Sequence, residues 1–242
     1  MITLSTIIYE GNFRKILKSD SWFLNYNSKY ISKKRLNINN IQSITEFESL
    51  LKEINNDIEV CYVRDKAEEA NEYFKLNTNL DTYGYNYIMG YFTDLITINT
   101  DYVFNVASDC QNDIVLKDDF FEKSIDILKS DDVLVVTIPW FYPKDDYIGI
   151  GEQDFTNTID EKDNKSKKIN DDFWFSKIMC DQVFITKIEK LKKCDFTITN
   201  NLHPYPAYGG LSFEMRLGNY IMTNNKYRAI IKGYSYYLHG KD

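Results

Sequence analysis

The stretch YVFNVASDC, residues 102–110, combines a strand-forming run with a carboxylate at its end. Tyr102 to Val106 is rich in β-branched and aromatic residues, which favour a buried strand. Small residues and one acid, Asp109, follow at once. In open α/β sheets the ligand crevice lies at the carboxyl ends of the strands, so a carboxylate there could hold a metal ion or a ligand hydroxyl. Ser-Asp is also ordinary turn chemistry, and the local sequence leaves both interpretations open.

Strand-like and helical patterns alternate on both sides of this stretch. The runs 2–9, 34–39, 58–63 and 133–139 predict further strands, and the apolar stripe of 85–98 predicts the clearest helix. Strands that alternate with helices indicate an α/β fold with a mostly parallel central sheet flanked by helices.

Capping residues predict where three other helices begin. Thr45 is expected at a helix cap because Glu48 follows three residues later, as in a capping box. Asp118 or Asp119 is expected to cap a second helix, and Ser212 a last helix that runs from Phe213 to about Met222.

Composition limits the function classes. The chain has 242 residues, 43% of them hydrophobic, which suits a single domain. A net charge of −7 argues against a nucleic-acid partner. Four widely spaced cysteines, no membrane-length apolar run and no signal pattern favour a cytoplasmic protein without a transmembrane segment. The polar segment 149–172 is expected to be a mobile excursion or lid.

Several features follow one another in a familiar order: Asp109 at a strand end, Trp140 at another, a Gly-Gly turn before an acidic helix start, and His239 near the end. This order resembles the GT-A glycosyltransferases, and especially the smaller bacterial and viral members built as one nucleotide-sugar-binding domain. The resemblance implies one GT-A domain over residues 1–242. It also implies transfer of a sugar from a nucleotide-diphosphate donor to an acceptor hydroxyl, in glycan or surface-polysaccharide synthesis. The acceptor could be a glycan, a lipid-linked molecule or a small molecule.

In the family, an Asp-x-Asp pattern holds a divalent metal that bridges the donor diphosphate. This chain reads Ala107-Ser108-Asp109, so the first acid is missing and a Mn²⁺ or Mg²⁺ cofactor is in question. One carboxylate with phosphate oxygens and waters can still hold Mg²⁺, and the resemblance places His239 as a second ligand. Without a metal, basic side chains would have to stabilise the leaving group, and the candidates are Arg64, Arg216 and Lys241.

The resemblance also implies a general base. In inverting members an acid follows a Gly-containing acceptor loop at a helix start, and here Glu214 follows Tyr208, Gly209 and Gly210. An acid in a first helical turn is also favourable for the helix alone. Asp181, in an Asp-Gln pair that resembles one opening a helix in several GT-A families, is expected to support the base.

Donor contacts are implied for residues near the strand ends and on the clearest helix: Thr6, Tyr9, Asn39, Arg64, Asp94, Ser108 and Asp109. Acceptor contacts are implied for Trp140 and for the Tyr208-Gly209-Gly210 turn. Each of these residues is also compatible with ordinary packing.

Two other functions remain open. A nucleotidyltransferase would need a Gly-rich basic loop after the first strand, where this chain has only Gly11 and Arg14. A catalytically silent carbohydrate-binding or scaffold protein is favoured by Ala107.

Overall fold

The computed structural model describes residues 1–54, 57–79, 84–108, 110–111, 116–138, 140–141, 171–198, 211–234 and 237–239. Its centre is an eight-stranded sheet in the order β3-β2-β1-β4-β9-β6-β10-β8. The strands are β1 (Ile2–Ile8), β2 (Ile31–Ile38), β3 (Ile58–Tyr62), β4 (Tyr102–Val106), β6 (Val133–Thr137), β8 (Phe173–Ser176), β9 (Val183–Lys187) and β10 (Tyr227–Ile231).

Most neighbouring strands are parallel. Strands β3, β2, β1 and β4 run in one direction, and β6 pairs parallel with β10. Strand β9 lies antiparallel between β4 and β6, and β8 is an antiparallel edge strand. The predicted α/β fold with a mostly parallel sheet is confirmed.

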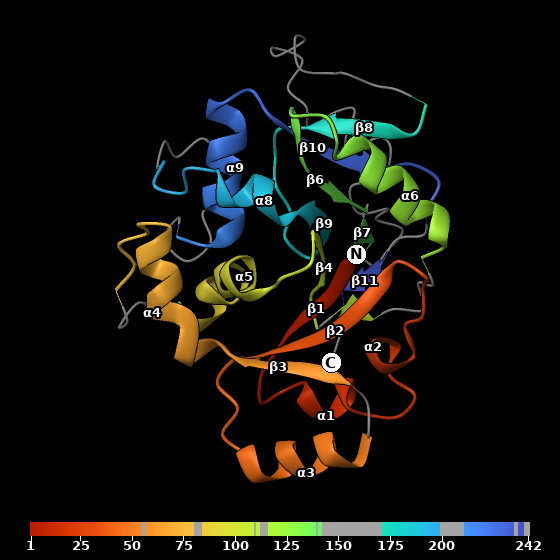
Figure 1. Ribbon diagram of the computed structural model, residues 1–242, viewed down its shortest axis with the longest axis vertical. Helices are drawn as coiled ribbons and strands as arrows, with labels where there is room; N and C mark the ends of the chain where they lie inside the picture. Colours follow the sequence, from red (N-terminus) through yellow and green to blue (C-terminus); the bar gives the residue numbers. More distant parts are fainter. Residues whose placement is uncertain are drawn as a thin grey trace.

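Helices cover both faces of the sheet (Figure 1). One core contains residues of α1 (Phe13–Ile16), α2 (Trp22–Asn25), α3 (Ile44–Ile54) and α6 (Asp118–Ile127). The other contains residues of α4 (Val63–Tyr73), α5 (Tyr85–Thr97), α8 (Ile188–Lys192) and α9 (Phe213–Thr223). All seven residues of β1 are buried because both of its faces are covered.

Helix α5 lies unusually close to β1 at Gly90. A Cβ atom at this position would lie 2.7 Å from Ile7 Cδ1, so any larger residue would force the buried Ile7 side chain to shift. Nine of the helix's thirteen residues are buried, which explains why its sequence is apolar on more than one face.

Two of the predicted helix caps are wrong. Helix α3 begins at Ile44, and Phe47 N donates to Ser43 O at 3.0 Å, so Ser43 rather than Thr45 precedes the first turn. Lys117 caps α6, and Asp118 is already helical. Ser212 is confirmed as the cap of α9, because its Oγ accepts a hydrogen bond from Met215 N at 3.3 Å.

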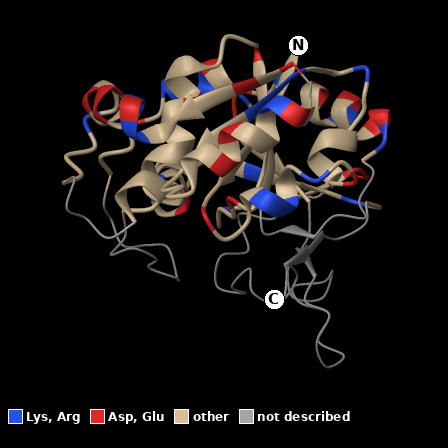
Figure 2. Ribbon diagram, turned by 90° about the horizontal axis from the view of Figure 1, so that it is seen from below, with Lys and Arg blue, Asp and Glu red and all other residues tan. Residues whose placement is uncertain are grey.

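A second, three-stranded sheet joins distant parts of the chain. It has the order β5-β11-β7, with β5 at Cys110–Gln111, β11 at Tyr237–His239 and β7 at Trp140–Phe141. Within the described ranges, none of the helices has the length and apolar character needed to cross a bilayer. In the view of Figure 2, acidic and basic residues are interspersed over the described ribbon.

Candidate functional site

The carboxyl ends of β1, β2, β3 and β4 meet at one edge of the sheet, because these strands are parallel. Tyr9, Asn39 and Ser108 come directly or closely after three of these strands, and Arg64 lies at the start of the helix that follows β3. Four of the predicted donor residues therefore share this edge, which is where α/β sheets bind ligands.

Asn12 joins the ends of β1 and β4. Its Nδ2 donates to Ser108 Oγ, and its Oδ1 accepts from Tyr9 N at 2.9 Å. Asn12 is buried, whereas Tyr9 is 43% exposed at the edge. In the sequence Asn12 is recognisable only as part of the Glu10-Gly11-Asn12 turn after the first strand, and its role as a link to Ser108 comes from the structure.

The small sheet brings the C-terminal segment to the end of β4. In the antiparallel pairing of β11 with β5, His239 lies opposite Cys110, the residue next to Asp109 in sequence. Asp109 itself lies outside the described residues, as do the side chains of Cys110 and His239. Over the described ranges, no three His, Cys, Asp or Glu side chains are grouped to hold a metal ion.

Asp181 lies at the same edge, beside the end of β4. Ala107 N donates to Gln182 O at 2.7 Å, and Tyr91 Oη donates to Asp181 O at 3.2 Å. In this chain the Asp-Gln pair is followed by strand β9, which begins at Val183, whereas the similar pair in several GT-A families opens a helix. The antiparallel direction of β9 places its first residue at the edge where the parallel strands end.

Glu214 and Asp181 interact electrostatically although 32 residues separate them in the sequence. The pKa of Glu214 is raised from 4.5 to about 8, mainly by burial and next by the Asp181 carboxylate, while Arg228 opposes the shift. Arg228, from β10, is only 4% exposed, and the sequence analysis missed it because no local pattern marks it. The structure therefore brings together the two acids that were predicted for catalysis.

Cys180 lies beside these acids but is not a nucleophile. Burial raises the pKa of its thiol to about 12, with Arg228 partly opposing the shift, so the group is neutral at physiological pH.

A cavity of about 350 Å³ lies at the ends of β2 and β3. Asn40, Tyr62, Arg64 and Asn86 contribute to its wall. Asn86 Nδ2 donates to Asn40 Oδ1 at 2.7 Å, and the Arg64 guanidinium lies 5.6 Å from the centre of the Tyr62 ring. Arg64 is exposed, and its Nε lies 3.4 Å from Asp65 Oδ1, so this cation of the cavity wall forms an ion pair at the surface.

Thr6 and Asp94 do not lie at the edge. The Thr6 side chain is fully buried within β1. Asp94 is 2% exposed, pairs with Arg35 Nε at 3.0 Å and accepts from Ser5 Oγ at 2.6 Å. Burial raises the pKa of Asp94, and Arg35 opposes the shift. The ion pair of Asp94 with Arg35 joins α5 to β2 in the sheet. Because Asp94 is held in this pair and Thr6 is buried in β1, we leave both residues out of the donor site.

Some predicted residues lie outside the described residues. They are Tyr208, Gly209 and Gly210, the side chain of Trp140, Lys241, and all of the 149–172 segment except 171–172.

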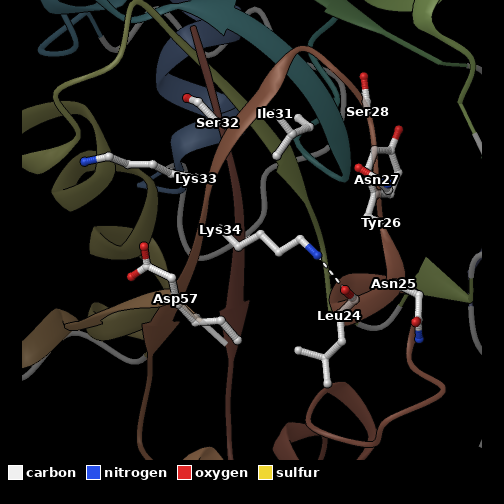
Figure 3. A pocket seen from close by; sticks show the side chains of 11 residues that line it. Leu24, Asn25, Tyr26, Asn27, Ser28, Ile31, Ser32, Lys33, Lys34 and Asp57 are labelled. Atoms are coloured by element: carbon white, nitrogen blue, oxygen red, sulfur yellow. Dashed lines mark hydrogen bonds between the residues drawn. The ribbon is translucent and has the colours of Figure 1, made fainter. Parts of the chain in front are cut away.

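A larger cavity, of about 450 Å³, lies at the opposite edge of the sheet, near the start of β2 and β3 (Figure 3). Lys34 crosses it and donates from Nζ to Leu24 O at 2.5 Å. None of the predicted site residues lines this cavity.

Comparison with known proteins identifies the fold. No protein-family model matches the sequence, and no curated protein matches it. The structure of S. aureus TarS 1-349 in complex with UDP-GlcNAc matches with a TM-score of 0.53 and 14% sequence identity, over 100% of this chain and 58% of that one. This chain has the GT-A fold. The complex of TarS 1-349 with UDP matches over 98% of this chain and 59% of that one, with a TM-score of 0.50 and 15% identity.

These similarities establish the fold alone. The GT-A chain described here spans less than two thirds of the TarS chain that it matches. Glucosyl-3-phosphoglycerate synthase from Mycobacterium tuberculosis, in complex with Mg²⁺ and UDP, matches with a TM-score of 0.45, which is too low to support an inference about this chain.

Proposed function

We propose that this protein is a glycosyltransferase that moves a sugar from a nucleotide-diphosphate donor to an acceptor hydroxyl with inversion. The observation that carries the proposal is the electrostatic interaction of Glu214 with Asp181, which precedes β9 at the strand edge of a GT-A sheet. The comparison with TarS adds a donor class to test first, because that protein is seen with UDP and UDP-GlcNAc.

Glu214 is the proposed base. A carboxylate with a pKa near 8 binds a proton far more tightly than an ordinary one, which suits removal of a hydroxyl proton as the new bond forms. The buried Asp181 favours this high proton affinity through its negative charge. In the reaction, ionised Glu214 takes the acceptor proton while the acceptor oxygen attacks the anomeric carbon and the nucleoside diphosphate leaves.

Asp109 and His239 are the proposed ligands of a divalent cation. The pairing of His239 with Cys110 supports this, because Cys110 is the residue next to Asp109 in the sequence. Carboxylate and imidazole are suitable ligands for Mn²⁺, and Mg²⁺ would rely more on Asp109 and water. When bound, such an ion would neutralise the charge that develops on the leaving diphosphate. Asn12 holds Ser108, and so orients the backbone that leads to Asp109.

The proposed donor contacts are Tyr9, Asn39, Arg64 and Ser108. The exposed Tyr9 ring offers a flat surface at the edge, and Arg64 offers a cation beside the cavity of about 350 Å³. Trp140 and the Tyr208-Gly209-Gly210 turn remain the proposed acceptor contacts.

The nucleotidyltransferase alternative lacks a basic residue in the loop between β1 and α1, because Arg14 lies within α1. Arg14 Nη2 lies within hydrogen-bonding distance of Glu46, and its Nη1 lies 3.4 Å from Glu10. Arg14 therefore interacts with protein carboxylates, and we do not propose this function.

Calorimetry and a donor assay test the proposal. We expect one of UDP, GDP, CMP or dTDP to bind, and the corresponding sugar donor to be hydrolysed slowly in the presence of Mn²⁺. Asp109→Asn should abolish hydrolysis, whereas Glu53→Gln, on the exposed face of α3, should leave it unchanged. If none of the nucleotides binds, the protein is not a transferase. If a nucleotide binds and Asp109→Asn has no effect on hydrolysis, the proposed metal site at Asp109 is wrong.

A further inference from the structure

Arg216 is a buried cation with an unusual set of partners. It is 2% exposed, and four of its N–H groups donate to neutral oxygens. Nε donates to Leu211 O at 3.0 Å and Nη1 to Phe196 O at 2.8 Å, while Nη2 donates to Leu76 O and to Thr78 Oγ1, each at 3.1 Å. The guanidinium is therefore committed to the protein, and the prediction that it stabilises a leaving group does not fit this placement.

These partners belong to three separate segments. Leu76 and Thr78 follow α4, Phe196 follows α8, and Leu211 precedes α9. Four oxygens from these three segments accept hydrogen bonds, and one planar guanidinium supplies all the donors in a fixed geometry. A lysine ammonium is a point donor on a flexible stem and cannot reproduce this arrangement.

The same helical turn carries Glu214. Glu214 and Arg216 are two residues apart, which on a helix corresponds to a rotation of about 200°. Their side chains therefore leave α9 in nearly opposite directions. Arg216 holds α9 from one side, while the Glu214 side chain, whose pKa the Asp181 charge raises, leaves α9 on the other. The start of α9 is thus fixed by contacts that lie away from the reacting groups.

We propose that Arg216 is a positioning residue that holds the first turn of α9 so that Glu214 stays against Asp181. This inference rests on the proposed function for its kinetic consequence. The placement itself can be measured without any activity. Within the described residues, the titratable and charged groups that act on Glu214 are Asp181, Arg228 and Cys180. The four hydrogen bonds of the Arg216 guanidinium go to other residues.

The first test uses kinetics. Arg216→Lys should lower kcat by about 10- to 100-fold, because misplacement of a catalytic group by about 1 Å can cost that much. UDP affinity should stay unchanged, since the donor edge is formed by other strands. Phe23→Leu, in α2 on the opposite face of the sheet, is the matched control: it reduces packing in the other core and should leave kcat unchanged. Equal kcat values for Arg216→Lys and Phe23→Leu would overturn the proposal.

The second test needs no activity. The difference in unfolding free energy between Glu214→Gln and its parent should depend on pH, because the folded protein raises the pKa of Glu214. In an Arg216→Lys background this pH dependence should shrink, because a loosened α9 lets water reach Glu214. It should persist in a Phe23→Leu background. Persistence in both backgrounds would refute the proposal, whatever the outcome of the donor assay.

A milder variant covers the case in which Arg216→Lys does not fold. Thr78→Val removes one of the acceptors and leaves the guanidinium and the three carbonyls in place. It should reduce kcat and the pH dependence in the same direction but by less. An unchanged kcat and pH dependence in Thr78→Val would count against the proposal.

Discussion

Replacing Glu214 with Gln should make the protein less sensitive to pH between about 5 and 8. The pKa of Glu214 is raised from 4.5 to about 8 in the folded state, mainly by burial. Between these two values the unfolded chain has lost the proton while the folded protein keeps it. The wild-type protein therefore loses stability as pH rises, and the contribution that is fully present below pH 4.5 is gone above about pH 8.

The size of the effect follows from linkage. One bound proton changes the free energy of unfolding by about 1.4 kcal/mol per pH unit, so three units from pH 5 to pH 8 amount to about 4 kcal/mol. This is an upper value, because Glu214 and Asp181 interact and the proton is shared between them. Gln resembles the protonated acid in size and charge and has no proton to lose. The variant should gain stability relative to the wild type as pH rises.

Urea unfolding at pH 5, 6, 7 and 8 measures this difference. Glu214→Gln and the wild type should have similar stability at pH 5 and diverge steadily up to pH 8. Glu53→Gln, on the exposed face of α3, controls for the loss of one negative charge and should run parallel to the wild type. Parallel curves for Glu214→Gln and the wild type would show that the raised pKa, and with it the argument for a strong base, is incorrect.

Three other predictions concern the activity of Glu214, the approach of α5 to β1 at Gly90 and the hydrogen bonds of Glu10. Transfer activity should rise with pH through about 8 as Glu214 ionises, and Glu214→Gln should lower kcat by about 10²- to 10⁴-fold, as a pH–rate profile of both proteins would show. Gly90→Ala should destabilise the protein by about 1–3 kcal/mol because of the 2.7 Å approach of Ile7 Cδ1, and Ile7→Val, which removes that atom, should restore most of the loss in thermal unfolding. Hydrogen bonds from Ser43, at the start of α3, lower the pKa of Glu10 to about 2. Glu10→Gln should therefore lower the Tm at pH 7. The difference in Tm from the wild type should disappear as pH falls from 4.5 towards 2.

The extended elements were predictable because their signal is local. The strands at 2–8 and 102–106 and helix 85–97 appear within a residue or two of their predicted bounds. Helix α4 was missed because its buried residues, Val63, Ala67 and Ala70, are too few and too small to give a clear apolar stripe. The cap of α3 was misplaced by two residues because Ser43 and Thr45 are both good caps.

The candidate site was only partly predictable. Tyr9, Asn39 and Arg64 lie at the expected edge, since parallel strands must end together. Asp94 could not be placed from the sequence, because its partner Arg35 lies on another strand and buries the carboxylate in an ion pair.

The sequence by itself determined the strands at 2–8 and 102–106, the helix at 85–97 and the strand-end location of Tyr9, Asn39 and Arg64, because hydrophobic periodicity and turn chemistry act over a few residues. Only the tertiary structure decided the state of the proposed base. Burial, Asp181 and Arg228 set the pKa of Glu214, and Arg216 holds its helix through oxygens from three segments. Electrostatic energy and hydrogen bonding depend on distance in space, and residues far apart in a chain acquire that proximity only through folding.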